Sequence, residues 1–268
     1  MPELPEVETV LRTLETQIGG EEIVSVIVRY PKIVEADPDE FAKRLCGRHF
    51  LGFQRRGKYL LFQMEDVTLV SHLRMEGKYY ILSREDPVDR HTHVIFQLGS
   101  GRELRYHDTR KFGRMELWPK EFDLNGFHGL GPEPFADAFS AGYLYHIAHE
   151  RRVPVKTLLL DQSVVAGIGN IYADEICFAV GLRPGMSARR LTKPQCERIV
   201  NETRRILNLA IQAGGTTIRS YTSSLGVTGL FQLDCMVHAR KTCSKCGENT
   251  KIKTIGGRTS YYCPCCQK

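Results

Sequence analysis

Four cysteines near the end of the chain constrain its fold more than any other feature. Cys243 and Cys246 form one Cys-x2-Cys pair, and 16 residues separate it from a second pair, Cys263 and Cys266. This ligand number and spacing are typical of a four-cysteine zinc site, in which a hairpin brings two thiolate pairs together. Disulfides or a chance arrangement are the alternatives, but nothing in the sequence indicates secretion. We therefore predict a zinc finger with one structural Zn²⁺ over residues 235–268.

The composition favours a soluble protein of a reducing compartment. The 268 residues are 42% hydrophobic, and no apolar run approaches the ~20 residues that span a bilayer. Met1 is followed by Pro2 and Glu3, without the positive and apolar regions of a signal peptide. We expect a cytoplasmic monomer with no membrane partner. Four further cysteines are expected to be buried as small apolar residues: Cys46, Cys177, Cys196 and Cys235.

The excess positive charge gathers at the C-terminal end. Residues 236–268 hold seven Lys and Arg residues against Glu248 alone, whereas the 235 residues before them balance at 30 against 30. A zinc module that carries the whole net charge of +6 indicates a polyanionic partner such as nucleic acid. A solvated surface would explain any one of these cations, but it explains seven of them against one acid less well.

Hydrophobic periodicity divides the chain into segments. Residues 5–18 have the apolar spacing of one helix and end at a Gly-Gly pair. Short β-rich runs with the rhythm of a sandwich or barrel follow: Ile23–Tyr30, Tyr59–Met64, Thr68–Leu73, Val94–Leu98, Glu103–Tyr106 and Met115–Trp118. Helical composition returns in three later segments: Phe139–His149, Asn170–Val180 and Lys193–Ala213.

These segments predict an α+β multidomain fold. The stretch Asn125–Pro134, rich in Gly and Pro, is the best linker candidate, and Gly256-Gly257 is a natural hairpin tip. We predict an N-terminal helix with a β-sandwich over residues 1–125 and a helical domain over residues 126–234. The zinc finger completes the chain.

Four motifs carry a resemblance to a known family, in this order: Pro2–Val10 (PELPEVETV), Arg55–Tyr59 (RRGKY), Gly167–Tyr172 (GIGNIY) and the four-cysteine finger. The match spans essentially the full length, and the chain resembles the bacterial formamidopyrimidine-DNA glycosylases. The resemblance implies a β-sandwich, a helix-two-turns-helix domain and a zinc finger. It also implies base-excision repair of double-stranded DNA, with removal of oxidised purines such as 8-oxoguanine and lyase activity at abasic sites.

The first motif contains the implied nucleophile. If Met1 is removed, Pro2 presents a secondary terminal amine, and an α-amino pKa near ~7.7–8.0 leaves far more neutral amine at pH 7 than a lysine near ~10.4. Attack on the sugar C1′ gives a cationic iminium, which acidifies the C2′ protons and favours strand-cleaving elimination. The alternative is that Pro2 merely helps to start a helix whose positive end Glu3 and Glu6 stabilise.

The resemblance implies a role for the other catalytic candidates. Glu3 would protonate the deoxyribose ring oxygen, and Glu6, on the same helical face, could share a proton with it. Lys58 would be the acid of β-elimination. Arg258, beside the Gly-Gly tip, would contact phosphate and assist δ-elimination. Lys58 and Arg258 could each otherwise be a solvated hairpin cation.

Eversion of a damaged nucleotide leaves a gap in the duplex. Met75, Arg110 and Phe112 resemble the family's intercalating residues. Two apolar wedges would replace the lost stacking, and the guanidinium could donate to the orphaned cytosine. Core packing is the alternative for Met75 or Phe112 taken singly.

The resemblance also implies contacts to the DNA backbone. His91, Arg151 and Asn170 stand where the family holds phosphates, and Lys156 is expected near the same surface. Asn170 could instead be an ordinary helix N-cap, and both roles can coexist, because a helix N-terminus is itself an anion site.

The segment Gly214–Tyr221 bears on the substrate. It is similar to the loop that closes over 8-oxoguanine in this family, whereas the related endonuclease VIII branch lacks a comparable loop. A purine substrate is therefore favoured, with an endonuclease VIII-like enzyme for oxidised pyrimidines or a non-catalytic nucleic-acid-binding module as alternatives. The residues implied in base recognition are Glu6, Glu76, Thr216, Ile218, Arg219, Ser220 and Tyr221.

Two residues depart from the family pattern. His238 stands where a phosphate-contacting tyrosine is usual, and it could donate in place of that tyrosine. Cys265 lies between two predicted ligands, where it could compete for zinc or be prone to oxidation.

Overall fold

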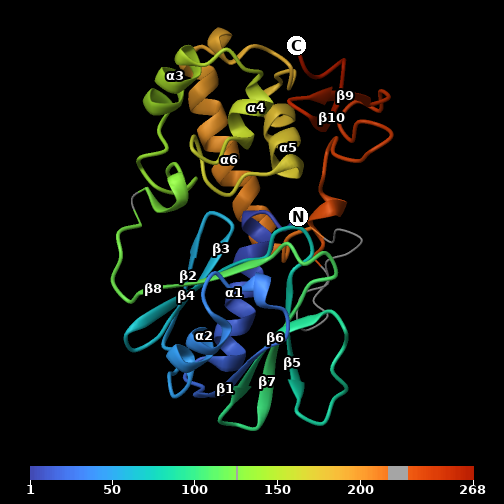
Figure 1. Ribbon diagram of the computed structural model, residues 1–268. Helices are drawn as coiled ribbons and strands as arrows, with labels where there is room; N and C mark the ends of the chain where they lie inside the picture. The colour runs from blue at the N-terminus through green and yellow to red at the C-terminus, as the bar shows by residue number, and fades with distance from the viewer. Residues whose placement is uncertain (125, 217–228) are drawn as a thin grey trace. The chain divides into compact units, whose positions relative to one another are not determined.

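The computed structural model describes residues 1–124, 126–216 and 229–268, which form two compact units (Figure 1). Unit 1 comprises Met1–Leu124 and Gly214–Gly229, and unit 2 comprises Asn125–Ala213 and Leu230–Lys268. A short segment late in the sequence therefore returns to the N-terminal unit. The helical segments and the four-cysteine segment cluster together in unit 2.

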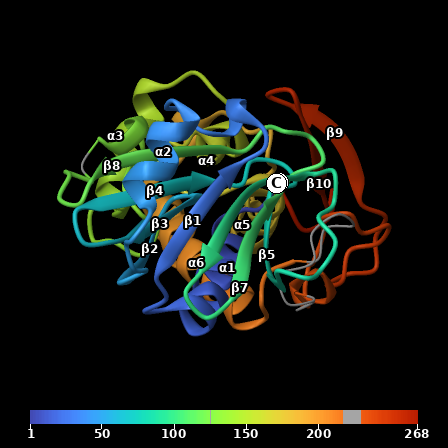
Figure 2. The same cartoon turned by 60° about the horizontal axis from the view of Figure 1, so that its bottom comes forward.

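Unit 1 contains two four-stranded antiparallel sheets, of order β1-β6-β7-β5 and β2-β3-β4-β8. Figure 2 shows β2, β3 and β4 grouped apart from β5 and β7. The strands are β1 (Ile23–Val28), β2 (Gly52–Arg56), β3 (Tyr59–Gln63), β4 (Val67–His72), β5 (Lys78–Ser83), β6 (Thr92–Leu98), β7 (Arg102–His107) and β8 (Arg114–Pro119). The short helix η1 (Pro31–Ile33) precedes α2 (Pro38–Leu45).

The first helix, α1 (Leu4–Ile18), supplies one side of the core of unit 1. It begins at a capping box between Glu3 and Glu6, with Pro5 in its first turn, where a missing N–H does no harm. Its apolar face is buried in the same hydrophobic cluster as residues from both sheets. This burial fixes the position of the helix start, and with it the first residues of the chain: the buried face is Val7, Val10, Leu11, Leu14 and Ile18.

Unit 2 is built around α5 (Asn170–Val180), which is buried on most of its sides and contacts α4, α6 and β10. The helix ends at Gly181, whose φ of +75° suits glycine at this cap position. The other elements are α3 (Ala141–Glu150), α4 (Val155–Leu160), α6 (Lys193–Gln212), β9 (Lys251–Ile255), β10 (Arg258–Tyr262) and the short helices η2 (Phe127–Gly129), η3 (Ala188–Arg190) and η4 (Phe231–Leu233).

The α+β architecture confirms the predicted fold class. Among the α-helices and β-strands of the described residues, four were not predicted, namely α2, α4, β2 and β5. The expectation of a buried thiol was wrong for Cys46, which is exposed and whose Sγ lies 3.1 Å from the Val24 carbonyl oxygen, whereas Cys177, Cys196 and Cys235 are buried. Among the described residues, no helix is long and apolar enough to cross a membrane.

Candidate functional site

The start of α1 gathers buried carboxylates beside the first residues of the chain. Pro2 is buried, and the side chains of Glu3 and Glu6 belong to residues that are only 3% and 2% exposed. The Glu3 backbone N–H donates to Glu6 Oε2 at 2.8 Å. Thr216 donates to Glu6 Oε1 through its N–H at 2.7 Å and its hydroxyl at 3.0 Å. Glu6 therefore joins the start of α1 to the segment that follows Gly214.

Gly215 shows how close this segment approaches Glu6. Its φ of +79° favours glycine, and a Cβ at this position would lie 2.8 Å from Glu6 Oε1. Both features exclude larger residues, so the backbone itself packs against the carboxylate. Thr216 is thus placed by Glu6. The predicted base-recognition residues Ile218, Arg219, Ser220 and Tyr221 lie outside the described residues.

Lys58 lies in the turn between β2 and β3, directly after Gly57, whose φ is +56°. An ion pair anchors this turn to α1, because Arg55 Nε donates to Glu8 Oε2 at 2.8 Å and Arg55 Nη1 donates to the Gly57 carbonyl at 2.9 Å. Lys58 is only 5% exposed. The alternative of a solvated hairpin cation is therefore wrong for Lys58.

Charges from three segments act on the N-terminal amine. Burial is the main cause that lowers the pKa of the Met1 amine below its usual value, and the Lys58 ammonium lowers it further. The carboxylates of Glu3, Glu6 and Glu76 oppose this shift. The described chain retains Met1, so the Pro2 nitrogen is part of a peptide bond here. A partly desolvated environment with charges of both signs nevertheless surrounds the first residues.

The predicted wedge residues lie on two loops of unit 1. Met75 is half-buried in the loop between β4 and β5, and Phe112, in the loop between β7 and β8, is 47% exposed. The Arg110 guanidinium carbon lies 4.7 Å from the centroid of the Phe112 ring. Core packing therefore does not account for Phe112. Its ring and the Arg110 guanidinium are both exposed.

His91 lies in the loop between β5 and β6, which a buried arginine holds in place. The backbone N–H of His91 donates to Asp89 Oδ1 at 2.6 Å. Arg105, only 1% exposed, pairs with Glu103 at 2.7 Å and donates to carbonyl groups of this loop. The sequence did not single out Arg105, which fixes the loop through three carbonyl oxygens, those of Ser83, Asp86 and Pro87.

Two of the predicted phosphate contacts in unit 2 already have protein partners. Arg151 pairs with Asp161 and is half-buried. Asn170 is the first residue of α5, and its Nδ2 donates to the Thr259 carbonyl at 3.0 Å. The N-cap of α5 is Gly169, so the N-cap alternative for Asn170 was wrong. Arg258 is exposed at the start of β10, beside the hairpin tip.

Lys156 is not on the surface, contrary to expectation. Its side chain is fully buried in a 2.8 Å ion pair with Asp174, whose own side chain is also 0% exposed. Its Nζ also donates to the Thr259 carbonyl at 2.9 Å and to Ser260 Oγ at 2.8 Å. His238 Nδ1 lies 2.8 Å from the second oxygen of Asp174. This cluster ties α4 and α5 to β10, so neither Lys156 nor the Nδ1 of His238 is free to meet a phosphate.

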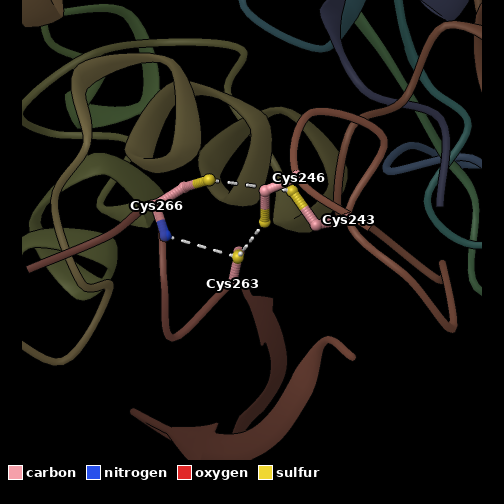
Figure 3. Close-up of side chains that lie close together, drawn as sticks. All are labelled: Cys243, Cys246, Cys263 and Cys266. Carbon is pink, nitrogen blue, oxygen red and sulfur yellow. Dashed lines mark hydrogen bonds between the residues drawn. The ribbon is translucent and has the colours of Figure 1, made fainter. Parts of the chain in front are cut away.

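The four predicted cysteine ligands come together at one point. Their Sγ atoms all lie within 4.8 Å of one another, with 4.0 Å between Cys243 and Cys266 and 3.5 Å between Cys246 and Cys263. Figure 3 shows the two pairs facing each other from separate turns. A tetrahedral ion with bonds of ~2.3 Å to sulfur places its ligands about 3.8 Å apart. The arrangement can therefore hold a metal ion.

All four cysteines of the cluster are free thiols, and the separations of 4.0 and 3.5 Å exceed the ~2.05 Å of an S–S bond. Each Cys-x2-Cys turn is closed by a backbone hydrogen bond, from Gly247 to Cys243 at 2.9 Å and from Gln267 to Cys263 at 3.1 Å. Cys265 is exposed and is not part of the cluster.

Comparison with known proteins shows similarity over the full length. The formamidopyrimidine-DNA glycosylase N-terminal domain matches residues 1–115, and the formamidopyrimidine-DNA glycosylase H2TH domain matches residues 130–222. A formamidopyrimidine-DNA glycosylase of Bacillus licheniformis is 46% identical over 274 residues, which cover 100% of both chains.

Solved structures of Lactococcus lactis Fpg are also similar. A complex with DNA containing N7-benzyl-Fapy-dG has a TM-score of 0.93 at 37% identity, and a complex with DNA containing an oxidised pyrimidine has a TM-score of 0.93 at 36% identity. Each alignment covers 100% of both chains. The chain therefore belongs to the formamidopyrimidine-DNA glycosylase family.

Proposed function

We propose that the protein is a bifunctional DNA glycosylase and abasic-site lyase that removes oxidised purines, 8-oxoguanine and formamidopyrimidines, from double-stranded DNA. The observation that carries this proposal is the environment of the first residues. Burial and Lys58 lower the pKa of the N-terminal amine, while two buried carboxylates lie beside it. After removal of Met1, the same environment would favour the neutral, nucleophilic form of the Pro2 amine.

The chemistry follows from that amine. The neutral Pro2 nitrogen bonds to C1′ as the bond between C1′ and the base breaks. The base leaves with the bonding electrons and takes up a proton, and the attached Pro2 nitrogen gives its own proton to water. Glu3 donates a proton to O4′, the C1′–O4′ bond opens, and a cationic iminium remains. Water accepts a C2′ proton, the electrons of that C–H bond form a C2′–C3′ double bond, and the 3′ phosphate departs with the C3′–O electrons and a proton from Lys58. A second elimination expels the 5′ phosphate, for which Arg258 would hold the departing group.

Two groups of residues are proposed to contact the duplex. Met75, Arg110 and Phe112 would fill the gap left by the everted nucleotide. His91, Arg151 and Asn170 would contact phosphates, for which Arg151 retains donors beyond the one that meets Asp161. Base recognition is assigned to Glu6, Glu76, Thr216 and the segment 218–221. In this proposal a monomer acts on DNA in the cytoplasm.

The metal proposed for the four-cysteine cluster is Zn²⁺. Four thiolates at these separations suit a soft, tetrahedral ion. Because all four positions would be filled by protein, the ion would have a structural role and bind no water. Cys243, Cys246, Cys263 and Cys266 would then hold the hairpin of β9 and β10, which presents Arg258.

Oxidised pyrimidines are a second candidate substrate class. The observation that favours them is the solved complex of Lactococcus lactis Fpg with DNA containing an oxidised pyrimidine. Excision rates on duplexes with 8-oxoguanine and with thymine glycol would rank the two classes. A higher rate on thymine glycol would reverse our order.

Borohydride trapping tests the nucleophile. Reduction should freeze a covalent adduct with lesion DNA only if an amine forms an iminium, and intact mass should show that Met1 has been removed. Pro2→Gly should lower excision and trapping while duplex affinity stays within a few-fold, because the amine takes part in chemistry and not in docking. Undiminished trapping by Pro2→Gly would show that another residue is the nucleophile.

Glu3→Gln should slow base excision by about 10²-fold or more, with a smaller effect on a preformed abasic site.

A further inference from the structure

Two loops of unit 1 carry the three wedge residues. Wedge loop 1 (residues 73–77) carries Met75, and wedge loop 2 (residues 108–113) carries Arg110 and Phe112. A hydrogen bond joins them, because the Thr109 hydroxyl donates to Glu76 Oε2. This is a side-chain link between loops that are more than 30 residues apart in sequence.

Both wedge loops pack against one buried hydroxyl, that of Tyr106. Tyr106 is 0% exposed, and a Cβ added to Gly77 in wedge loop 1 would lie 2.3 Å from its hydroxyl oxygen. A Cβ added to Gly113 in wedge loop 2 would lie 1.6 Å from the same atom. Both contacts are too close for any side chain, so each loop packs its glycine backbone against Tyr106.

A buried carboxylate fixes the backbone of wedge loop 2. Asp108 is 0% exposed. Its Oδ1 accepts the N–H of Arg110 at 2.9 Å, and its Oδ2 accepts those of Phe112 and Gly113, each at 2.9 Å. The Tyr106 hydroxyl lies 3.4 Å from Oδ2. The carboxylate therefore sets the backbone around both Arg110 and Phe112.

Each loop also holds a non-glycine residue in the left-handed region directly before its apolar wedge. Arg74 has a φ of +54° before Met75, and Lys111 has a φ of +58° before Phe112. Such a conformation is unfavourable for a residue with a side chain and persists only where the surroundings impose it. In wedge loop 1, part of that constraint is the bond from the Arg74 N–H to His72 Nδ1 at 2.9 Å.

We propose that Thr109 and Glu76 are positioning residues that lock the two wedge loops into one unit, so that Met75, Arg110 and Phe112 enter the duplex together. The proposal rests on the proposed function, since it concerns the step that follows eversion. Preorganisation favours insertion, because two independently moving loops would each have to be ordered when the duplex opens. The Glu76 carboxylate also raises the pKa of the Met1 amine, against the larger opposing effect of burial.

Three variants separate the link from other roles of these side chains. Thr109→Val keeps the shape and removes the donor. Thr109→Ser restores the hydroxyl. Glu76→Gln removes the charge but keeps an oxygen that can accept from Thr109. Because Thr109 is exposed and water competes for its hydroxyl, we expect a modest effect, with about five- to tenfold slower insertion for Thr109→Val.

Insertion is measured by stopped-flow fluorescence of 2-aminopurine placed beside a tetrahydrofuran abasic analogue opposite cytosine. Thr109→Val should slow the fluorescence change and, to the same extent, single-turnover excision of 8-oxoguanine. Thr109→Ser should insert within about twofold of the unmodified protein, and Glu76→Gln, which keeps an acceptor for Thr109, should insert faster than Thr109→Val. Borohydride trapping of Thr109→Val on a single-stranded abasic oligonucleotide should be unchanged, because no duplex has to be wedged.

Three results would overturn the link. Unchanged insertion by Thr109→Val would show that the loops need no tie. Equal losses for Thr109→Val and Thr109→Ser would assign the effect to packing. Slow insertion by Glu76→Gln alone would assign Glu76 a role through its charge. The insertion assay requires only duplex binding and no chemistry. If the unmodified protein inserts its wedge residues but neither excises the base nor forms a trapped adduct, the proposed function is wrong. The comparison of the variants would still decide whether Thr109 and Glu76 link the loops.

Discussion

Replacement of Lys156 tests whether this buried cation serves architecture or DNA binding. The ion pair of Lys156 with Asp174 is fully buried, and the ammonium also donates to Thr259 and Ser260 of β10. Lys156→Met fills a similar volume without charge or donors. We expect this change to loosen β10 from α4 and α5. Asp174 is left as a buried charge, Ser260 Oγ loses the Lys156 donor, and the Thr259 carbonyl keeps only the donor from Asn170.

The magnitude follows from the burial of both partners. Removing one member of a buried ion pair costs about 3–5 kcal/mol, since the remaining charge is uncompensated. His238 still contacts Asp174, so the lower end, about 3 kcal/mol, is the better expectation. Because every ~1.4 kcal/mol is tenfold, amide protection against hydrogen exchange in β10 should fall on the order of 10²-fold.

Native-state hydrogen exchange at the amides of β9, β10 and α5 measures this change in unit 2 alone. A local measurement is needed because a chain with two units need not unfold in one step. Lys253→Met, an exposed lysine on β9, is the matched control and should leave protection unchanged. The double variant Lys156→Met with Asp174→Leu should recover part of the loss, because it removes the orphaned charge. A different result would refute the architectural role. Lys156→Met would keep full amide protection and would reduce the slope of log binding constant against log salt concentration by about one, as loss of a phosphate contact does.

Three further predictions concern catalysis, base recognition and the metal. The Lys58 charge lowers the pKa of the N-terminal amine, so Lys58→Gln should raise that pKa and move the acidic limb of borohydride trapping on a preformed abasic site to higher pH; a shift to lower pH would contradict this sign. Arg110→Ala should weaken binding to a lesion opposite cytosine by roughly 1–3 kcal/mol and narrow the preference over adenine, whereas Arg151→Ala should weaken both duplexes alike, as salt titrations would show. Cys243→Ser should lose zinc, measured by atomic absorption, together with DNA binding, and an active zinc-free variant would disprove the structural role.

The sequence located the elements whose patterns are local. The helix predicted over Asn170–Val180 has those bounds in the structure, and the Gly256-Gly257 tip joins β9 to β10. The four-cysteine cluster followed from spacing alone, because two short turns suffice to aim the thiolates. By contrast, β2 (Gly52–Arg56) was missed. Its sequence GFQRR has little apolar alternation, and its pairing with β3 supplies what the local pattern lacks.

The supports of the site could not be predicted from the sequence. Asp108 and Tyr106 look like an ordinary turn acid and a strand aromatic, and only the fold shows that wedge loop 2 is built on them. The sequence allowed His238 to donate in place of a phosphate-contacting tyrosine, but its Nδ1 lies 2.8 Å from Asp174 Oδ2. The pairing of residues distant in sequence decides each of these roles, and one sequence records residue types without recording their contacts.

The candidate cations differ in their burial, which the sequence alone did not show. Arg110 and Arg258 are exposed, so each can meet a phosphate or a base edge and keep its hydration until DNA arrives. Lys58 and Lys156 are buried, and a desolvated ammonium must be compensated by fixed partners. Lys156 has such a partner in Asp174 and therefore holds the fold together. Lys58 lowers the pKa of the Met1 amine from a turn anchored to α1, and we propose it as the proton donor for elimination.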